Sequence, residues 1–126
     1  MAKRPAKPKI GTTPRLTLRV DFDDLGALGP GKVRLLERID DLGSISAAGR
    51  SMDMSYRRAW LLVDSLNGMF AEAVVTTRHG GGGKALLTPF GRLVVDSYRS
   101  MEREAFGAVG RHLATLQQAV ARPRRG

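Results

Sequence analysis

Two short stretches of this sequence carry side chains that could contact a phosphate backbone and the edges of bases. The first is Ser55-Tyr56-Arg57-Arg58, in which a hydroxyl residue suited to an N-cap precedes two adjacent arginines. An arginine can donate two parallel hydrogen bonds to guanine or to a phosphate, and a helix N-terminus offers unpaired N–H groups to the same anions. These residues favour nucleic-acid binding at the start of a helix, although an amphipathic helix with merely solvated arginines has the same pattern.

The second stretch is rich in glycine and carries charge on both sides. It consists of Arg78, His79, Gly80, Gly81, Gly82, Gly83 and Lys84. A nucleotide-binding phosphate loop requires Ser or Thr after its lysine and a helix after the loop. Here Ala85 follows the lysine and the next run favours a strand, so we reject that interpretation. Two interpretations remain: the wing of a winged helix, whose glycine N–H groups approach phosphates, and a simple surface turn.

Residues suited to catalysis or to metal binding are scarce. The chain has no cysteine, which excludes disulfides, thiolate zinc sites and cysteine nucleophiles. Neither of its two histidines, His79 and His112, has a companion acid or a second ligand at helical spacing. We therefore expect no enzyme activity, no metal site and no cofactor.

The hydrophobic pattern predicts the elements that must hold these stretches. Apolar residues alternate with polar ones over 15–22 and indicate a half-buried strand. The expected inward face of this strand is Leu16, Leu18, Val20 and Phe22. Three helices follow. Their expected ranges are about 30–42, about 44–52 with a cap at Ser44 or Ser46, and about 56–70 with a cap at Ser55.

The second and third of these helices are separated by a turn of about three residues, the length typical of a helix-turn-helix. In such a unit the second helix enters the major groove with its N-terminal residues at the bases. The runs 73–77 and 85–87 predict a β hairpin around the glycine stretch. The expected fold class is therefore mainly α with a small β hairpin, a winged helix-turn-helix.

A long helix is expected from the Thr88-Pro89 pair to about 120, because these residues suit the N-cap and first helical positions. Its apolar stripe is longer than one small core needs. We therefore expect it to be a dimerisation helix, and the protein to be a homodimer.

The chain has a formal charge of +9, and all of this excess lies near its ends. Residues 1–19 contain six bases and no acid, residues 122–126 contain three arginines, and the remainder is neutral. We expect 1–14 and 121–126 to be disordered basic tails that aid solubility or add nonspecific phosphate contacts. Residues 15–88 would form the DNA-binding domain and 89–120 the dimerisation helix. The absence of a signal-like or membrane-spanning apolar run predicts a cytoplasmic protein. The expected DNA binding would make it nucleoid-associated.

Three motifs together resemble the DNA-binding domain of ModE-type molybdate-responsive transcription regulators. They are Gly43-Ser-Ile-Ser-Ala-Ala-Gly49, Met54-Ser-Tyr-Arg-Arg-Ala-Trp60, and Gly80–Gly83 leading into Leu86-Leu-Thr88 and Gly91. The first motif is also similar to LysR-type winged-helix regulators. The resemblance covers residues 15–110, roughly. It implies a protein that dimerises, partly through the long helix, and that binds double-stranded DNA at an inverted-repeat operator.

The resemblance also implies roles for individual residues. Ser55, Tyr56, Arg57 and Arg58 would be recognition-helix contacts, Ser44 and Ser46 would lie near the DNA backbone, and residues 78–84 would reach flanking phosphates or the minor groove. Full-length members carry C-terminal oxyanion-binding domains, and this sequence ends at Gly126. We therefore expect the part that binds molybdate to be missing, which leaves a response to molybdate open. The alternative interpretation is a nucleoid-like protein of low sequence specificity, or an adaptor.

Overall fold

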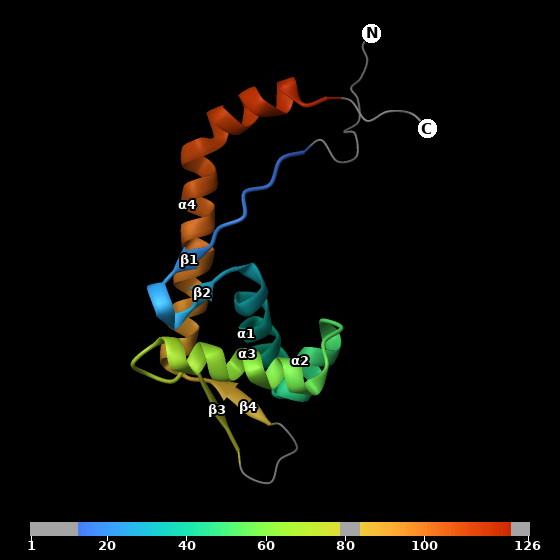
Figure 1. Cartoon of the computed structure of the whole chain (residues 1–126), viewed down its shortest axis with the longest axis vertical. Coiled ribbons are helices and arrows are strands. Elements are labelled where there is room, and N and C mark those ends of the chain that lie inside the picture. Colours follow the sequence, from blue (N-terminus) through green and yellow to red (C-terminus); the bar gives the residue numbers. More distant parts are fainter. Residues whose placement is uncertain (1–12, 79–83, 122–126) are drawn as a thin grey trace. The chain divides into compact units, whose positions relative to one another are not determined.

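The computed structural model describes residues 13–78 and 84–121 (Figure 1). These residues form parts of two compact units. One unit is residues 17–100. The described residues 13–16 and 101–121 belong to the other. As expected, the architecture is mainly α, with four helices, small β hairpins and a long C-terminal helix, and it is consistent with a winged helix-turn-helix.

Helices α1 (Pro30–Leu42), α2 (Ile45–Ser51) and α3 (Tyr56–Met69) lie close to the expected ranges because local signals fix their ends. Pro30 is the first residue of α1, and Gly43 ends the helix with a left-handed φ of 70°. The Ser44 hydroxyl accepts a hydrogen bond from the Ala47 N–H, which decides between the two predicted caps of α2. Ser55 caps α3 in the same way.

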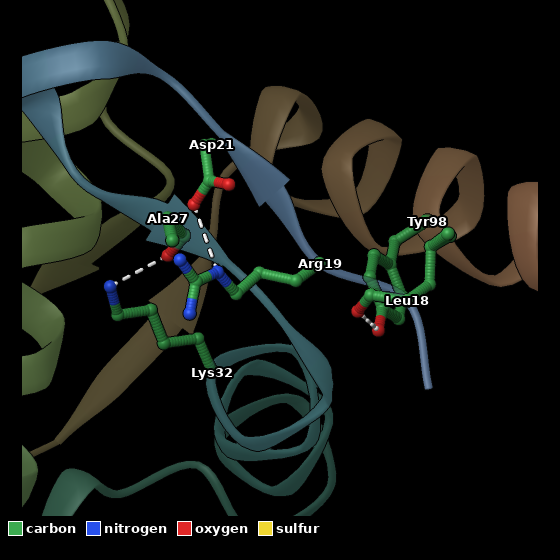
Figure 2. Close-up of polar contacts among 6 residues, drawn as sticks. All are labelled: Leu18, Arg19, Asp21, Ala27, Lys32 and Tyr98. Atoms are coloured by element: carbon green, nitrogen blue, oxygen red, sulfur yellow. Dashed lines mark hydrogen bonds and ion pairs between the residues drawn. The ribbon is translucent and has the colours of Figure 1, made fainter. Parts of the chain in front are cut away.

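The N-terminal strand is much shorter than the alternation predicts. Only β1 (Val20–Asp21) is a strand, and it pairs with β2 (Ala27–Leu28), which the sequence analysis did not predict. Leu18, Val20 and Phe22 still pack against the core. Hydrogen bonds from side chains, and not a longer pairing of strands, hold this region. The Tyr98 hydroxyl donates to the Leu18 carbonyl at 2.6 Å, and Lys32 Nζ donates to the Ala27 carbonyl at 2.7 Å (Figure 2).

The second hairpin consists of β3 (Val75–Thr77) and β4 (Ala85–Leu87), paired antiparallel with Thr76 opposite Leu86. The link between α1 and α2 joins this hairpin on the β4 side. The Ala85 N–H donates to the Gly43 carbonyl at 3.0 Å, and Ser44 forms a β-bridge with Lys84. The end of the hairpin nearest its loop is thereby tied to the start of α2.

Helix α4 (Pro89–Ala119) begins as expected, with the Thr88 hydroxyl accepting from the Gly91 N–H at 2.9 Å. Its buried residues are Gly91, Val94, Val95 and Tyr98, all in the first unit. Leu93, which belongs to the apolar stripe of this helix, is 57% exposed. Beyond Tyr98 no described residue of the helix is buried, and Met101, Phe106 and Leu116 are all exposed.

The core of the 17–100 unit brings α1, α3 and the start of α4 together. Its covered residues include Val33, Leu36 and Ile39 of α1 and Ala59, Val63 and Leu66 of α3, which recur at helical spacing in the sequence. Two ion pairs join α1 to α4 beside this core: Arg99–Glu37 and Arg92–Asp40, each at 2.8 Å. The hydrogen bond from Arg99, with the positive charge of that side chain, holds the pKa of the Glu37 carboxyl below its usual range.

Candidate nucleic-acid interface

The N-terminus of α3 presents two cations and no acid. Arg57 and Arg58 are exposed, and the first turn contains no acidic residue. The Ser55 hydroxyl accepts from the Arg58 N–H at 3.1 Å, which leaves the hydroxyl proton free to be donated outward. A helix N-terminus with this composition attracts anions through its N–H groups, its dipole and its side chains together.

Two aromatic residues lie beside these arginines and have different environments. The Tyr56 ring is 54% exposed and meets the edge of the Trp60 ring at a centroid distance of 6.1 Å. Trp60 itself is partly buried and packs against the core, as expected for a packing anchor. Its Nε1–H is buried and has no hydrogen-bond partner among the residues that the structure describes. Tyr56 is thus the aromatic side chain available to a ligand.

The exposure pattern of α3 reveals two residues that the sequence reasoning missed. The inward face of the helix is Ala59, Val63 and Leu66, and the opposite face carries Arg57, Leu61 and Asp64. These last three are all exposed and follow each other at i, i+4 and i+7, the spacing of one helix face. We call them the outward stripe. Extending the helical period from Arg57 along the sequence would have found Leu61 and Asp64.

The two predicted serines occupy the start of α2. Both Ser44 and Ser46 are partly buried. The Ser44 hydroxyl accepts from the Ala47 N–H at 3.1 Å, and its backbone pairs with Lys84. The fold therefore brings Ser44 next to one end of the second candidate stretch, although the two residues are far apart in sequence.

The charged residues that flank the glycines lie at the loop end of the hairpin, next to the paired residues Thr77 and Ala85. Arg78 and Lys84 are exposed and face each other, with the Arg78 N–H donating to the Lys84 carbonyl at 3.1 Å. The remaining predicted residues of this stretch, His79, Gly80, Gly81, Gly82 and Gly83, lie outside the described residues. The hairpin itself, as β3 and β4, is confirmed.

Asn67 joins α3 directly to this hairpin, and the sequence analysis did not identify it. Its Oδ1 accepts from the N–H groups of Val74 and Val75 at 2.8 and 3.1 Å, and its Nδ2 donates to the Val75 carbonyl at 3.1 Å. An asparagine near the end of an amphipathic helix gives no signal of its own, because its partners come from a later segment. Its effect is to fix the chain entering β3 against α3.

Other surfaces of the described residues fit a binding site less well. A cleft of about 680 Å³ between α1 and α4 is lined by charged residues that include four arginines and four acids, so its charge is balanced. No group of three or more metal-ligating side chains occurs among residues 13–78 and 84–121. In the same residues, none of the helices combines the length and the apolar character needed to cross a bilayer. The surface around the start of α3 is therefore the main candidate interface.

Comparison with known proteins gives a consistent set of relatives, although no family model matches the chain. It is 38% identical to the molybdenum transport protein ModE of Azotobacter vinelandii, over 86% of this chain and 42% of that protein. It is 43% identical to the molybdenum-pterin-binding protein MopB of Rhodobacter capsulatus, over 60% of this chain and 28% of that protein. It is 32% identical to the DNA-binding transcriptional dual regulator ModE of Escherichia coli strain K12, over 55% of this chain and 27% of that protein.

The chain spans less than half the length of the curated relatives it matches. These relatives are named as regulators, a transport protein and molybdenum-pterin-binding proteins, and none of them is named as an enzyme, in agreement with the expectation for this chain. The comparisons confirm the resemblance seen in the motifs: this chain is a homologue of the N-terminal region of ModE.

Proposed function

We propose that this protein is a sequence-specific, DNA-binding transcription regulator that inserts α3 into the major groove. The observation that carries the proposal is the start of α3, where exposed Arg57 and Arg58 follow the Ser55 cap in the second helix of a helix-turn-helix pair. The homology to ModE supports it, since the relatives of that name in Haemophilus influenzae and Escherichia coli are named as transcriptional regulators, and the second is named as DNA-binding.

The β3–β4 hairpin serves as the wing in this proposal. Arg78 and Lys84 are exposed at the loop end of its strands, and Ser44 at the start of α2 lies beside Lys84. These residues would contact phosphates on either side of the α3 site, with His79 and Gly80–Gly83 reaching further along the duplex. Phosphate contacts of this kind fix the position of a protein on DNA and contribute affinity that falls with salt.

The protein would bind DNA as a homodimer through the later part of α4. Met101, Phe106 and Leu116 are exposed on this helix, and burying such residues against a second copy would remove apolar surface from water. In a two-fold dimer the two recognition helices lie about 34–36 Å apart, one turn of DNA, and the matching operator is an inverted repeat. On this proposal the protein acts in the cytoplasm, where its operator is.

Selection of bound duplexes from a random pool tests the proposal. Enrichment of an inverted repeat is the expected result, and a pool that stays random would overturn it. Substitution of Arg57 sharpens the test: because one bidentate contact to a base discriminates by about 1–3 kcal/mol, Arg57→Ala should weaken binding to the selected site by about 5- to 150-fold. Binding to unrelated DNA should change much less.

A second candidate function is DNA binding with low specificity, and the charge distribution favours it. The whole excess of +9 comes from residues 1–19 and 122–126. Replacing Lys3, Lys7 and Lys9 with glutamine should reduce the salt dependence of binding equally for all sequences. If that change abolishes binding while Arg57→Ala has no effect, the low-specificity function is the correct one.

A further inference from the structure

The outward stripe of α3 carries three side chains of different chemistry. Arg57 is a cation, Leu61 is apolar and 55% exposed, and Asp64 is an anion. All three project from the face opposite the buried residues of the helix. Arg58 and Tyr56 lie to the two sides of this stripe, because neighbouring residues on a helix are about 100° apart. The stripe, rather than either side, is the part of α3 that would point to the floor of a groove.

The length of the stripe matches a short run of base pairs. With a rise of about 1.5 Å per residue, Arg57 and Leu61 are about 6 Å apart along the axis and Arg57 and Asp64 about 10.5 Å. Base pairs are stacked about 3.4 Å apart, so the three side chains span roughly three steps of a duplex. Each can therefore meet a different base pair when α3 lies along the major groove.

Leu61 has a chemical match in the major groove. A single exposed leucine is ordinary on a protein surface, so its exposure alone decides nothing. Its position does, because it lies between two charged residues on the face that the proposed function places against bases. The apolar group that a base pair presents in the major groove is the C5-methyl group of thymine.

Asp64 restricts the possible partners of the same face. A carboxylate is repelled by phosphates, so a DNA-facing Asp64 is favourable only where a base donates a hydrogen bond to it. Cytosine does so through its N4 amino group, which aspartate accepts. Within the described residues Asp64 has no ion-pair partner of its own, and its carboxylate is exposed.

We propose that Leu61 and Asp64 are specificity-determining residues, with Leu61 contacting the C5-methyl group of a thymine and Asp64 accepting a hydrogen bond from a cytosine, one to three base steps from the guanine bound by Arg57. This inference rests on the proposed function of α3 as a major-groove helix. It assigns a base type to each position of the stripe, and the experiment below separates its failure from the failure of that function.

The first measurement repeats the random-pool selection with the full chain and with Asp64→Asn. Asparagine prefers adenine, to which it can donate and from which it can accept. The expected result is a half-site in which one cytosine is replaced by adenine when the variant is used, with the other positions unchanged. The same preference for both proteins would overturn the role of Asp64.

The second measurement replaces each thymine of the selected half-site with uracil, which removes only the methyl group. Binding is followed by fluorescence anisotropy for the wild-type protein, Leu61→Ala and the control Leu25→Ala. Leu25 is also an exposed leucine, 60% exposed, but it lies in the turn between β1 and β2. One thymine per half-site should show a loss of about fourfold on conversion to uracil with the wild type and the control, as expected for one buried methyl group.

In Leu61→Ala that loss should disappear, because the contact is already absent. A loss that persists in Leu61→Ala would overturn the inference while leaving the proposed function intact. If no sequence is enriched in the pool at all, the proposed function fails and the inference with it. Circular dichroism confirms that each variant is folded, which is expected because Leu61 is on the surface and alanine favours helix.

Discussion

The side chain of Asn67 bonds to the chain entering β3 much as a neighbouring strand would. It accepts from two backbone N–H groups, those of Val74 and Val75, and it donates to the Val75 carbonyl. Replacing Asn67 with alanine removes all three bonds at once. Val74 and Val75 are themselves buried, so their N–H groups have few other partners when the amide is gone.

The cost of this change follows from the groups left behind. A buried donor that loses its partner costs about 1–3 kcal/mol, and two such donors would cost about 2–6 kcal/mol. Asn67 is only partly buried, so water can enter the space left by its side chain and satisfy some of this demand. We therefore expect Asn67→Ala to lower the free energy of unfolding by about 2–4 kcal/mol.

Urea denaturation followed by circular dichroism measures this value, read from the midpoint at constant slope. Ser65→Ala is the matched control, because Ser65 is also partly buried on α3 and no hydrogen bond of its side chain occurs among the described residues. The control should change the stability by less than about 0.5 kcal/mol. A similarly small effect of Asn67→Ala would refute the reasoning, since the hairpin would then not depend on α3 for its position.

Three further changes test other parts of the fold. Tyr98→Phe removes the hydroxyl that donates to the Leu18 carbonyl and should cost about 1–2 kcal/mol in thermal or urea unfolding. Gly91→Ala should prevent or severely weaken folding, because its Cβ would lie 2.1 Å from the Val74 carbonyl oxygen, whereas Gly68→Ala, with no neighbour within 4 Å, should raise stability by up to about 1 kcal/mol. Glu37 has a lowered pKa in the folded state, so its pairing with Arg99 stabilises above the unfolded pKa and is lost as pH falls through the folded pKa. Glu37→Gln should therefore destabilise the protein at pH 7 but have little effect at pH 2, and an equal loss at both would contradict the pairing.

Local sequence signals predicted the helices of the helix-turn-helix well. Gly43 with its left-handed φ, the Ser55 cap and the Thr88-Pro89 pair each act within a few residues of their position, so the sequence contains all the information needed. The sequence signals did not distinguish Ser44 from Ser46 as the N-cap of α2. In the structure Ser44 is the cap, and its backbone also pairs with that of Lys84, which lies forty residues later in the sequence.

Elements that depend on distant partners were predicted less well. The alternating run over 15–22 is strand only at Val20–Asp21, because the partner β2 is two residues long. The Leu18 carbonyl accepts a hydrogen bond from the Tyr98 hydroxyl instead of a strand partner. Leu93 of α4 is apolar but exposed, while Val95, two residues later, is buried. Which side of a long helix is covered depends on what packs there, and periodicity alone cannot supply that.

The candidate interface depends both on contacts between neighbouring residues and on contacts between segments that are distant in sequence. The positions of Arg57 and Arg58 are determined locally, since both residues closely follow the Ser55 N-cap, which can be recognised in the sequence. The position of the hairpin relative to α3 is not local: Asn67 holds the β3 side, and the bonded pair of Gly43 and Ala85 holds the β4 side. Because the two attachments are on different strands, the loss of one leaves the other in place. Asn67→Ala should therefore lower the free energy of unfolding by more than it weakens the free energy of DNA binding, when binding is assayed under conditions in which the variant remains folded.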